Sequence, residues 1–211
     1  MKKTLTFLLI AFSLNLSAQA FREGDIIASA GAGIAIYKYQ FTDVTNNSVT
    51  PRDTSGAWTF PFSAEYGVTN WLGGVFTFNY NNYIEGDSAT DENATGIDFL
   101  IGAGFHVPWN LNRFDLTGNI SYGFSKFKYQ YNGSNSGTAK ATGPALFVTI
   151  NPRFYFSSSR NIGMGFFYRY STYNYNNGEI KDNAGNTSKF KIEGPGNSFG
   201  LNLFYNIHSK E

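Results

Sequence analysis

The 211-residue sequence contains no cysteine and few charged residues for its length. The absence of cysteine excludes disulfide bonds and a lipid-modified N-terminal cysteine, so an exported chain of this kind depends on packing or on lipid for stability. Charged residues make up 15% of the chain, whereas a soluble domain usually has about a quarter. The chain has too few charged residues for a protein surrounded by water on all sides, and we expect part of its surface to contact an apolar environment.

The sequence also lacks long hydrophobic runs after its N-terminus. No stretch approaches the roughly 20 apolar residues of a membrane-spanning helix, which excludes a helical membrane protein. The chain is instead rich in glycine, tyrosine and phenylalanine, with 23, 14 and 21 copies. This mixture disfavours helices and suits strands, so we predict an all-β fold.

The first twenty residues have the pattern of a secretory signal peptide. A basic start at Lys2 and Lys3 precedes an apolar stretch too short to span a membrane and a small-residue cleavage site ending at Ala20. We predict a signal peptide, residues 1–20, and one domain, residues 21–211. Removing the two lysines takes the basic count from 16 to 14 against 15 acidic residues, so the formal charge moves from +1 to −1. We therefore expect no nucleic-acid partner.

Eight segments of the chain alternate apolar and polar side chains with period two, which is typical of strands whose faces meet different surroundings. They cover residues 26–39, 58–68, 71–83, 95–107, 115–124, 145–156, 162–171 and 198–207. Pro61 and Pro152 lie inside two of these segments, where we expect a bulge or an unpaired donor position.

The connections between the segments alternate strictly between short and long. Those after the second, fourth and sixth segments are brief, and the other four are long and rich in Asn, Asp, Gly, Ser and Thr. An outer-membrane barrel has tight turns on the periplasmic side and long loops outside. The pattern predicts an eight-stranded antiparallel up-and-down transmembrane β-barrel in the cell outer membrane.

The two faces of the segments favour this barrel over a soluble lipid-carrying barrel with its apolar face inside. The polar faces consist mostly of Gly, Ser, Thr and Asn, which suit a narrow lumen better than a water-exposed surface. Aromatic residues near the segment ends fit two interfacial girdles. We assign to them Tyr37, Trp58, Tyr80 and Tyr170 at one interface, and Tyr66, Trp71, Trp109 and Tyr205 at the other.

Two motifs carry a resemblance to a known family. The turn Tyr66-Gly67-Val68-Thr69-Asn70-Trp71-Leu72 is typical of small outer-membrane barrels, and residues 198–205 resemble the barrel-insertion signal. Residues 21–211 thus resemble the small outer-membrane β-barrel family of Bacteroidetes, related to the OmpX and OmpA-barrel group. One departure is that the chain continues to Glu211 instead of ending on an aromatic residue. The resemblance implies insertion by the barrel-assembly machinery, with outer-membrane lipid and lipopolysaccharide as partners.

The alternation of side chains along the predicted strands places five charged residues on the face that points into the lumen. Glu65, Asp115 and Arg153 fall toward the periplasmic end, and Asp98 and Arg169 fall toward the outer end. These charges form either an ion path or a network of pairs that fills and closes the barrel. We favour the closed network, because buried charges need partners.

Nothing in the sequence has the pattern of a catalytic site. The Gly-x-Gly triplets at residues 31–33, 102–104 and 163–165 lie within strands and lack the helix that a phosphate-binding loop precedes. His106 and His208 have no Ser, Cys or metal-ligand cluster at a diagnostic spacing. We predict no catalytic residue, no metal and no cofactor, and we interpret His106 as structural.

The loops carry charge of both signs. The second long loop is acidic, with Glu85, Asp87, Asp91 and Glu92, and the third is basic, with Lys126, Lys128 and Lys140. The two loops can pair across the rim or present a partner surface, and a calcium site in the acidic loop is a hypothesis without the EF-hand spacing. We interpret Tyr129, Tyr131, Tyr173 and Tyr175 as part of protruding strands with an adhesive edge.

Three functions fit these features. The first is a non-enzymatic barrel with a side-chain-filled lumen that serves envelope structure or surface contacts through long extracellular loops. The second is a narrow channel for small or apolar solutes, and the third is a lipid-modifying barrel enzyme. We rank them in that order.

Overall fold

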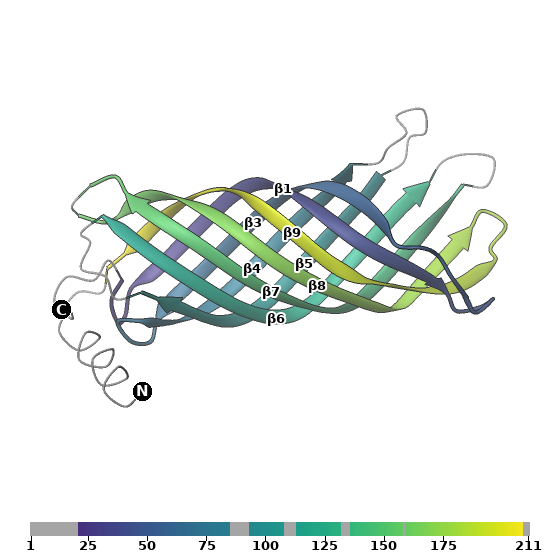
Figure 1. Ribbon diagram of the computed structural model, residues 1–211, viewed down its shortest axis with the longest axis horizontal. Helices are drawn as coiled ribbons and strands as arrows, with labels where there is room; N and C mark the ends of the chain where they lie inside the picture. The colour runs from purple at the N-terminus through teal and green to yellow at the C-terminus, as the bar shows by residue number, and fades with distance from the viewer. Residues whose placement is uncertain (1–20, 85–92, 108–112, 132–135, 158, 209–211) are drawn as a thin grey trace, which may run out of the picture.

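The computed structural model describes residues 21–84, 93–107, 113–131, 136–157 and 159–208. Nine antiparallel strands form in this part of the chain, and eight of them close into a ring (Figure 1). They are β1 (Ile26–Asp43), β2 (Ser48–Val49), β3 (Asp53–Gly67), β4 (Leu72–Ile84), β5 (Asn93–His106), β6 (Phe114–Tyr131), β7 (Gly137–Tyr155), β8 (Ile162–Asp182) and β9 (Thr187–Ile207). The barrel closes where β9 pairs with β1, and the short β2 pairs with the end of β1. The predicted eight-stranded barrel is confirmed, because each predicted segment falls in a different strand of the ring.

The two ends of the barrel have different connections. One end, which we term the turn end, has the connections of residues 68–71, 107–113 and 156–161. The opposite end, the loop end, has those of residues 44–52, 85–92, 132–136 and 183–186. Chain segments from both termini meet at the turn end, where His208 Nδ1 lies 3.2 Å from Asp25 Oδ1. In the described ranges, no helix is long and apolar enough to cross a membrane.

The strands extend further toward the loop end than the alternating pattern predicts. β8 and β9 have 21 residues each, and the predicted segments cover less than half of each strand. Only residues 183–186 connect them, so the long loop predicted there is wrong. Pairing continues because alternate side chains, such as Tyr173, Tyr175 and Phe190, are buried inside the extended wall.

Pro61 and Pro152 each interrupt a hydrogen-bonded ladder on one side. Pairing of β1 with β3 and of β7 with β8 skips equal numbers of positions on both strands there, and the register is unchanged. The expected unpaired donor position is therefore present, and a bulge at the prolines is not. The register shifts lie elsewhere, between Lys140 and Ala145 of β7 and after Tyr175 of β8.

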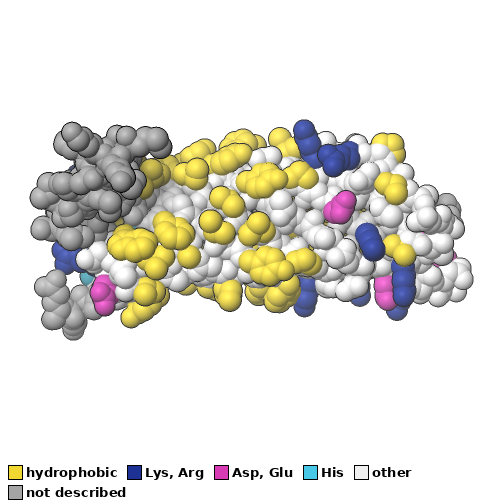
Figure 2. All heavy atoms as spheres, turned by 60° about the horizontal axis from the view of Figure 1, so that its bottom comes forward, with side chains coloured by type: hydrophobic (Ala, Val, Ile, Leu, Met, Phe, Trp, Pro, Cys, Tyr) yellow, Lys and Arg dark blue, Asp and Glu magenta, His cyan; other side chains and the backbone are white. Residues whose placement is uncertain are grey.

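The apolar face of the strands is the outer face of the barrel. Ile101 is 72% exposed, whereas the preceding Leu100 is only 1% exposed because it points inward. Phenylalanine rings with centroids 5.2 to 5.9 Å apart cross four neighbouring strands: Phe62, Phe78, Phe99 and Phe124. Figure 2 shows the apolar side chains as a broad band, with most charged side chains beyond it on one side. The alternative of a soluble barrel with an apolar interior is wrong.

The residues predicted for the aromatic girdles do not all lie on this outer face. Exposed on it are Trp58, Tyr66, Trp71, Tyr170 and Tyr205. Tyr80 is half-buried on the same face, and Trp109 lies outside the described residues. The assignment of Tyr37 is wrong, because its hydroxyl donates to Asn81 Oδ1 at 3.0 Å inside the barrel. Ile36 faces outward, so the next side chain must face inward.

Aspartates order two connections at the loop end. Asp43 accepts the backbone N–H groups of Thr45 at 2.8 Å and Asn46 at 3.1 Å, and Asp182 accepts the N–H of Asn186 at 2.7 Å. The backbone hydrogen bond from Asn46 lowers the pKa of Asp43, and the side-chain hydrogen bond from Asn186 lowers the pKa of Asp182. Both carboxylates thus act as turn acceptors, a common role of Asp in loops.

Candidate functional site

Four charged or ionisable side chains meet in the lumen near the turn end. His106 Nε2 lies 2.8 Å from Glu65 Oε1, and His106 Nδ1 lies 2.9 Å from Asp115 Oδ2. Arg153 Nη2 donates to Glu65 Oε2 at 2.9 Å. These residues, which we term the turn-end cluster, come from β3, β5, β6 and β7 and are all buried. A Cβ at Gly104 would overlap Glu65 Oε1, so the glycine leaves room for the carboxylate.

Phe21 covers the turn-end cluster. Its ring stacks on His106 with the centroids 3.6 Å apart and the planes 2° from parallel, and the side chain is 1% exposed. The predicted cleavage after Ala20 would make Phe21 the first residue of the mature chain. Aromatic and charged side chains therefore fill the turn end of the lumen.

Arg169 crosses the middle of the lumen. Its Nη1 donates to Asn79 Oδ1 at 3.1 Å and its Nε donates to Thr149 Oγ1 at 3.3 Å. The guanidinium also lies over the rings of Phe147 and Phe167, at 4.7 and 5.5 Å from their centroids. Neutral acceptors and aromatic faces thus surround this buried cation.

The middle of the lumen has little free space. A cavity of about 30 Å³ adjoins Arg169, and its polar lining includes Asn119, Asn151 and Asn202. Within the described part of the chain, the side-chain oxygens of these three asparagines have no hydrogen-bond partner. A space of this size accommodates about one water molecule but no larger solute.

Asp98 lies beyond Arg169 toward the loop end and accepts hydrogen bonds from neutral donors. The donors are Ser125 Oγ at 2.5 Å, Asn79 Nδ2 at 2.9 Å, Asn81 Nδ2 at 3.1 Å and the Tyr173 hydroxyl at 3.3 Å. Asn79 also accepts from Arg169, so one amide bridges the carboxylate and the guanidinium. This bridge holds the two charges in one network.

An aromatic layer fills the lumen at the loop end. Its buried aromatic members are Tyr37, Phe147, Tyr173, Tyr175 and Phe190. The rings of Tyr37 and Tyr173 meet edge to face with centroids 5.6 Å apart. The interpretation of Tyr173 and Tyr175 as an outer adhesive edge is wrong. Both are buried, because they lie at alternate positions after Arg169 on the same strand and point into the lumen as it does. Tyr129 packs partly buried against this layer, and the side chain of Tyr131 lies outside the described residues.

All five charges assigned to the lumen by parity point inward. The structure brings Glu65, Asp115 and Arg153 into one cluster and places Asp98 and Arg169 on either side of Asn79. Sequence reasoning missed that His106 links two carboxylates of this cluster. The available signal was its position on the inward-facing side of its strand. This alternation does not reveal which inward side chains lie at the same height along the barrel axis.

No group of His, Asp and Glu in the described ranges has the arrangement of a metal site. The acidic residues of the calcium hypothesis, Glu85, Asp87, Asp91 and Glu92, lie outside those ranges.

A comparison with protein families identifies this barrel. Residues 6–206 match the model of the outer membrane protein beta-barrel domain. The chain belongs to this family. The predicted localisation in the outer membrane is therefore confirmed. In outer-membrane barrels, the short turns face the periplasm and the longer connections face outward. No curated protein sequence matches the chain.

Solved outer-membrane barrels have the same fold. OprG from Pseudomonas aeruginosa is 11% identical, with a TM-score of 0.57 over 92% of this chain and 100% of its own. Neisserial surface protein A is 14% identical, with a TM-score of 0.53 over 87% and 99%. The outer membrane protease OmpT from Escherichia coli is 12% identical, with a TM-score of 0.53 over 90% and 99%. At these identities, the similarity between this chain and the three solved barrels concerns the fold alone.

Proposed function

We propose that the protein is a closed, non-enzymatic outer-membrane barrel that serves envelope structure or surface contacts. The observation that carries the proposal is the filling of the lumen at three successive levels. The turn-end cluster lies under Phe21, Arg169 occupies the middle, and the aromatic layer occupies the loop end. A solute has to displace paired charges and packed rings to pass, and both changes are costly.

Single-channel recording tests the closed lumen. The purified barrel in a planar bilayer is expected to show no stable conductance. Arg169→Ala is expected to behave in the same way, because the turn-end cluster and the aromatic layer remain on either side of it. Arg52→Ala, at an exposed position just before β3, controls for a change of charge outside the lumen. A stable conductance with an ion selectivity that changes in Arg169→Ala but not in Arg52→Ala would establish the channel instead.

The absence of enzymatic activity is the second part of the proposal. His106 is the residue on which a lipid-modifying reaction would depend, but both its ring nitrogens face carboxylates and Phe21 covers the ring. A general base needs a free nitrogen within reach of the proton that it abstracts.

Overexpression tests this second part. The lipid A and phospholipid profiles of cells are expected to be the same with the wild-type barrel, with His106→Ala and with an empty vector. The His106→Ala barrel must first be shown to reach the outer membrane. A modified lipid that the wild type produces and this variant does not would contradict the proposal.

A further inference from the structure

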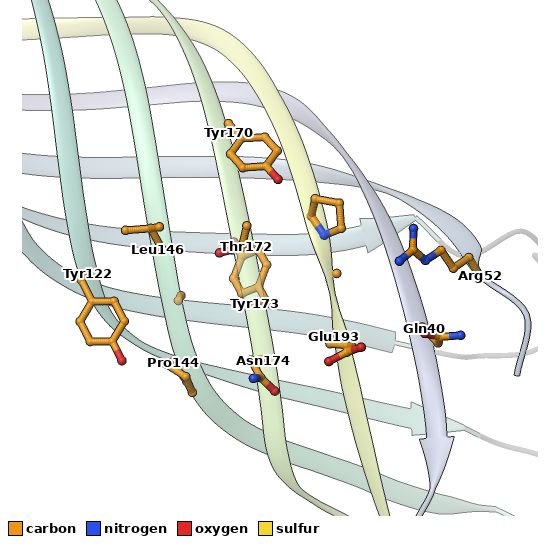
Figure 3. A pocket seen from close by; sticks show the side chains of 13 residues that line it. Gln40, Arg52, Tyr122, Pro144, Leu146, Tyr170, Thr172, Tyr173, Asn174 and Glu193 are labelled. Atoms are coloured by element: carbon orange, nitrogen blue, oxygen red, sulfur yellow. The ribbon is translucent and has the colours of Figure 1, made fainter. Parts of the chain in front are cut away.

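A depression of about 500 Å³ lies on the outer wall of the barrel, toward the loop end (Figure 3). It spans β6 to β9 and includes Gln40 of β1 and Arg52, which immediately precedes β3. The wall is irregular here, because β7 and β8 shift register between Lys140 and Ala145. Pairing of β9 with β1 is also interrupted around Pro195. Small side chains in the lining, such as Thr172 and Ala145, leave the surface hollow.

The two halves of the depression differ in polarity. Tyr122, Leu146 and Tyr170 line one half, and they belong to the apolar band that faces the membrane. Arg52 and Glu193 line the other half, nearer the loop end in Figure 3. A molecule in contact with both halves must have an apolar part inside the bilayer and a polar part at its surface. A membrane lipid meets this condition, whereas a soluble solute or peptide does not.

Three lysines lie on β6 and β7, the strands that carry Tyr122 and Leu146 of the apolar half, and are nearer the loop end. Lys126, Lys128 and Lys140 are exposed, and Lys128 and Lys140 are direct cross-strand partners of β6 and β7. Like charges in this position destabilise a sheet unless an anion lies between them. Within the described parts of β5 to β7, the only carboxylates are Asp98 and Asp115, and both point into the lumen.

Two carboxylates on neighbouring strands do not neutralise this charge. Glu179 of β8 is opposite Lys140, but it is also opposite Lys189 of β9. Glu193 shares the depression with Arg52. The wall therefore keeps an excess of positive charge, which suits a ligand with more than one negative charge.

We propose that the depression and the adjoining lysines bind lipid A of the outer leaflet. An acyl chain occupies the apolar half, and the two phosphates contact Arg52 and the lysines Lys126, Lys128 and Lys140. A phospholipid with one phosphate matches this charge less well. The inference rests on the placement of the barrel in the outer membrane and not on the closed lumen, so a conducting barrel leaves it intact.

Binding of lipid A to the purified barrel in a non-ionic detergent, measured by native mass spectrometry, tests the site. The triple variant Lys126→Gln, Lys128→Gln, Lys140→Gln is expected to bind lipid A about tenfold more weakly, since each exposed charge contact contributes modestly. The matched control is Arg22→Gln, Arg113→Gln, Arg160→Gln, which removes the same charge from the turn end, away from the depression. It is expected to bind like the wild type. Lipid A without phosphates is expected to bind the wild type at least as weakly as bisphosphorylated lipid A binds the first variant, because the contact with Arg52 is lost as well.

A second variant tests the apolar half independently of charge. Thr172→Trp fills the depression and is expected to weaken lipid A binding while all the cations remain. Folding of each variant is checked by its shift in mobility on an unheated gel. Equal losses in the two triple variants would overturn the proposal, because binding would then follow net charge. Binding of phosphatidylglycerol as tight as that of lipid A would also overturn it.

Discussion

Replacing Glu65 with alanine is expected to destabilise the barrel by about 3 to 5 kcal/mol, the usual cost of removing one partner of a buried ion pair. Glu65 contacts both Arg153 and His106, and its two neighbours are 2% and 5% exposed. Without the carboxylate, the guanidinium loses its closest acceptor while it remains buried. Asp115 cannot compensate, because its nearest approach to Arg153 is 3.7 Å and it already faces His106.

The free energy of unfolding in urea, measured by tryptophan fluorescence in lipid vesicles, checks this prediction. Glu179→Ala is the control, because it removes an exposed carboxylate from the outer wall and is expected to change stability little. Adding Arg153→Met to Glu65→Ala removes the unpaired cation and is expected to recover part of the loss. If Glu65→Ala and Glu179→Ala lose the same free energy, the turn-end cluster does not stabilise the barrel.

Gly33→Ala is expected to weaken the seam that closes the barrel, with a loss of about 3 kcal/mol, the upper end of the usual cost of overpacking. Gly33 of β1 is the register partner of Gly200 of β9. A Cβ on Gly33 would overlap the carbonyl oxygen of Phe199 and come within 2.9 Å of the Phe167 ring. A backbone carbonyl cannot move aside as a flexible side chain can, so the two strands must separate.

The fraction of barrel that stays folded on an unheated gel, measured over a temperature series, checks the second prediction. Gly118→Ala is the matched control, since a Cβ there has no neighbour within 4 Å. It is expected to melt at the wild-type temperature or slightly above it. Equal melting of the two variants would mean that the β1–β9 seam tolerates a side chain at Gly33, and the close approach would then be unimportant for closure.

The sequence-based predictions that are wrong at the loop end have one physical cause. The residues after Ser171 look like a loop because they are rich in Asn and Gly. They form strand because Tyr173 and Tyr175 are buried against the facing wall, where Tyr37 also lies. The burial that favours the strand comes from residues distant in the chain, and a local pattern does not contain it.

The amino-acid sequence by itself determined the strand number, the up-and-down order, the apolar outer face and the inward direction of five charges. These features follow from period-two alternation and connection length, which are local properties of the chain. Only the tertiary structure decided which inward side chains meet. Glu65 and Arg153 are 88 positions apart, and Asn79 and Arg169 are 90 apart. Their meeting depends on the register of every strand pair around the ring, because the stagger of a closed barrel accumulates from strand to strand until β9 joins β1.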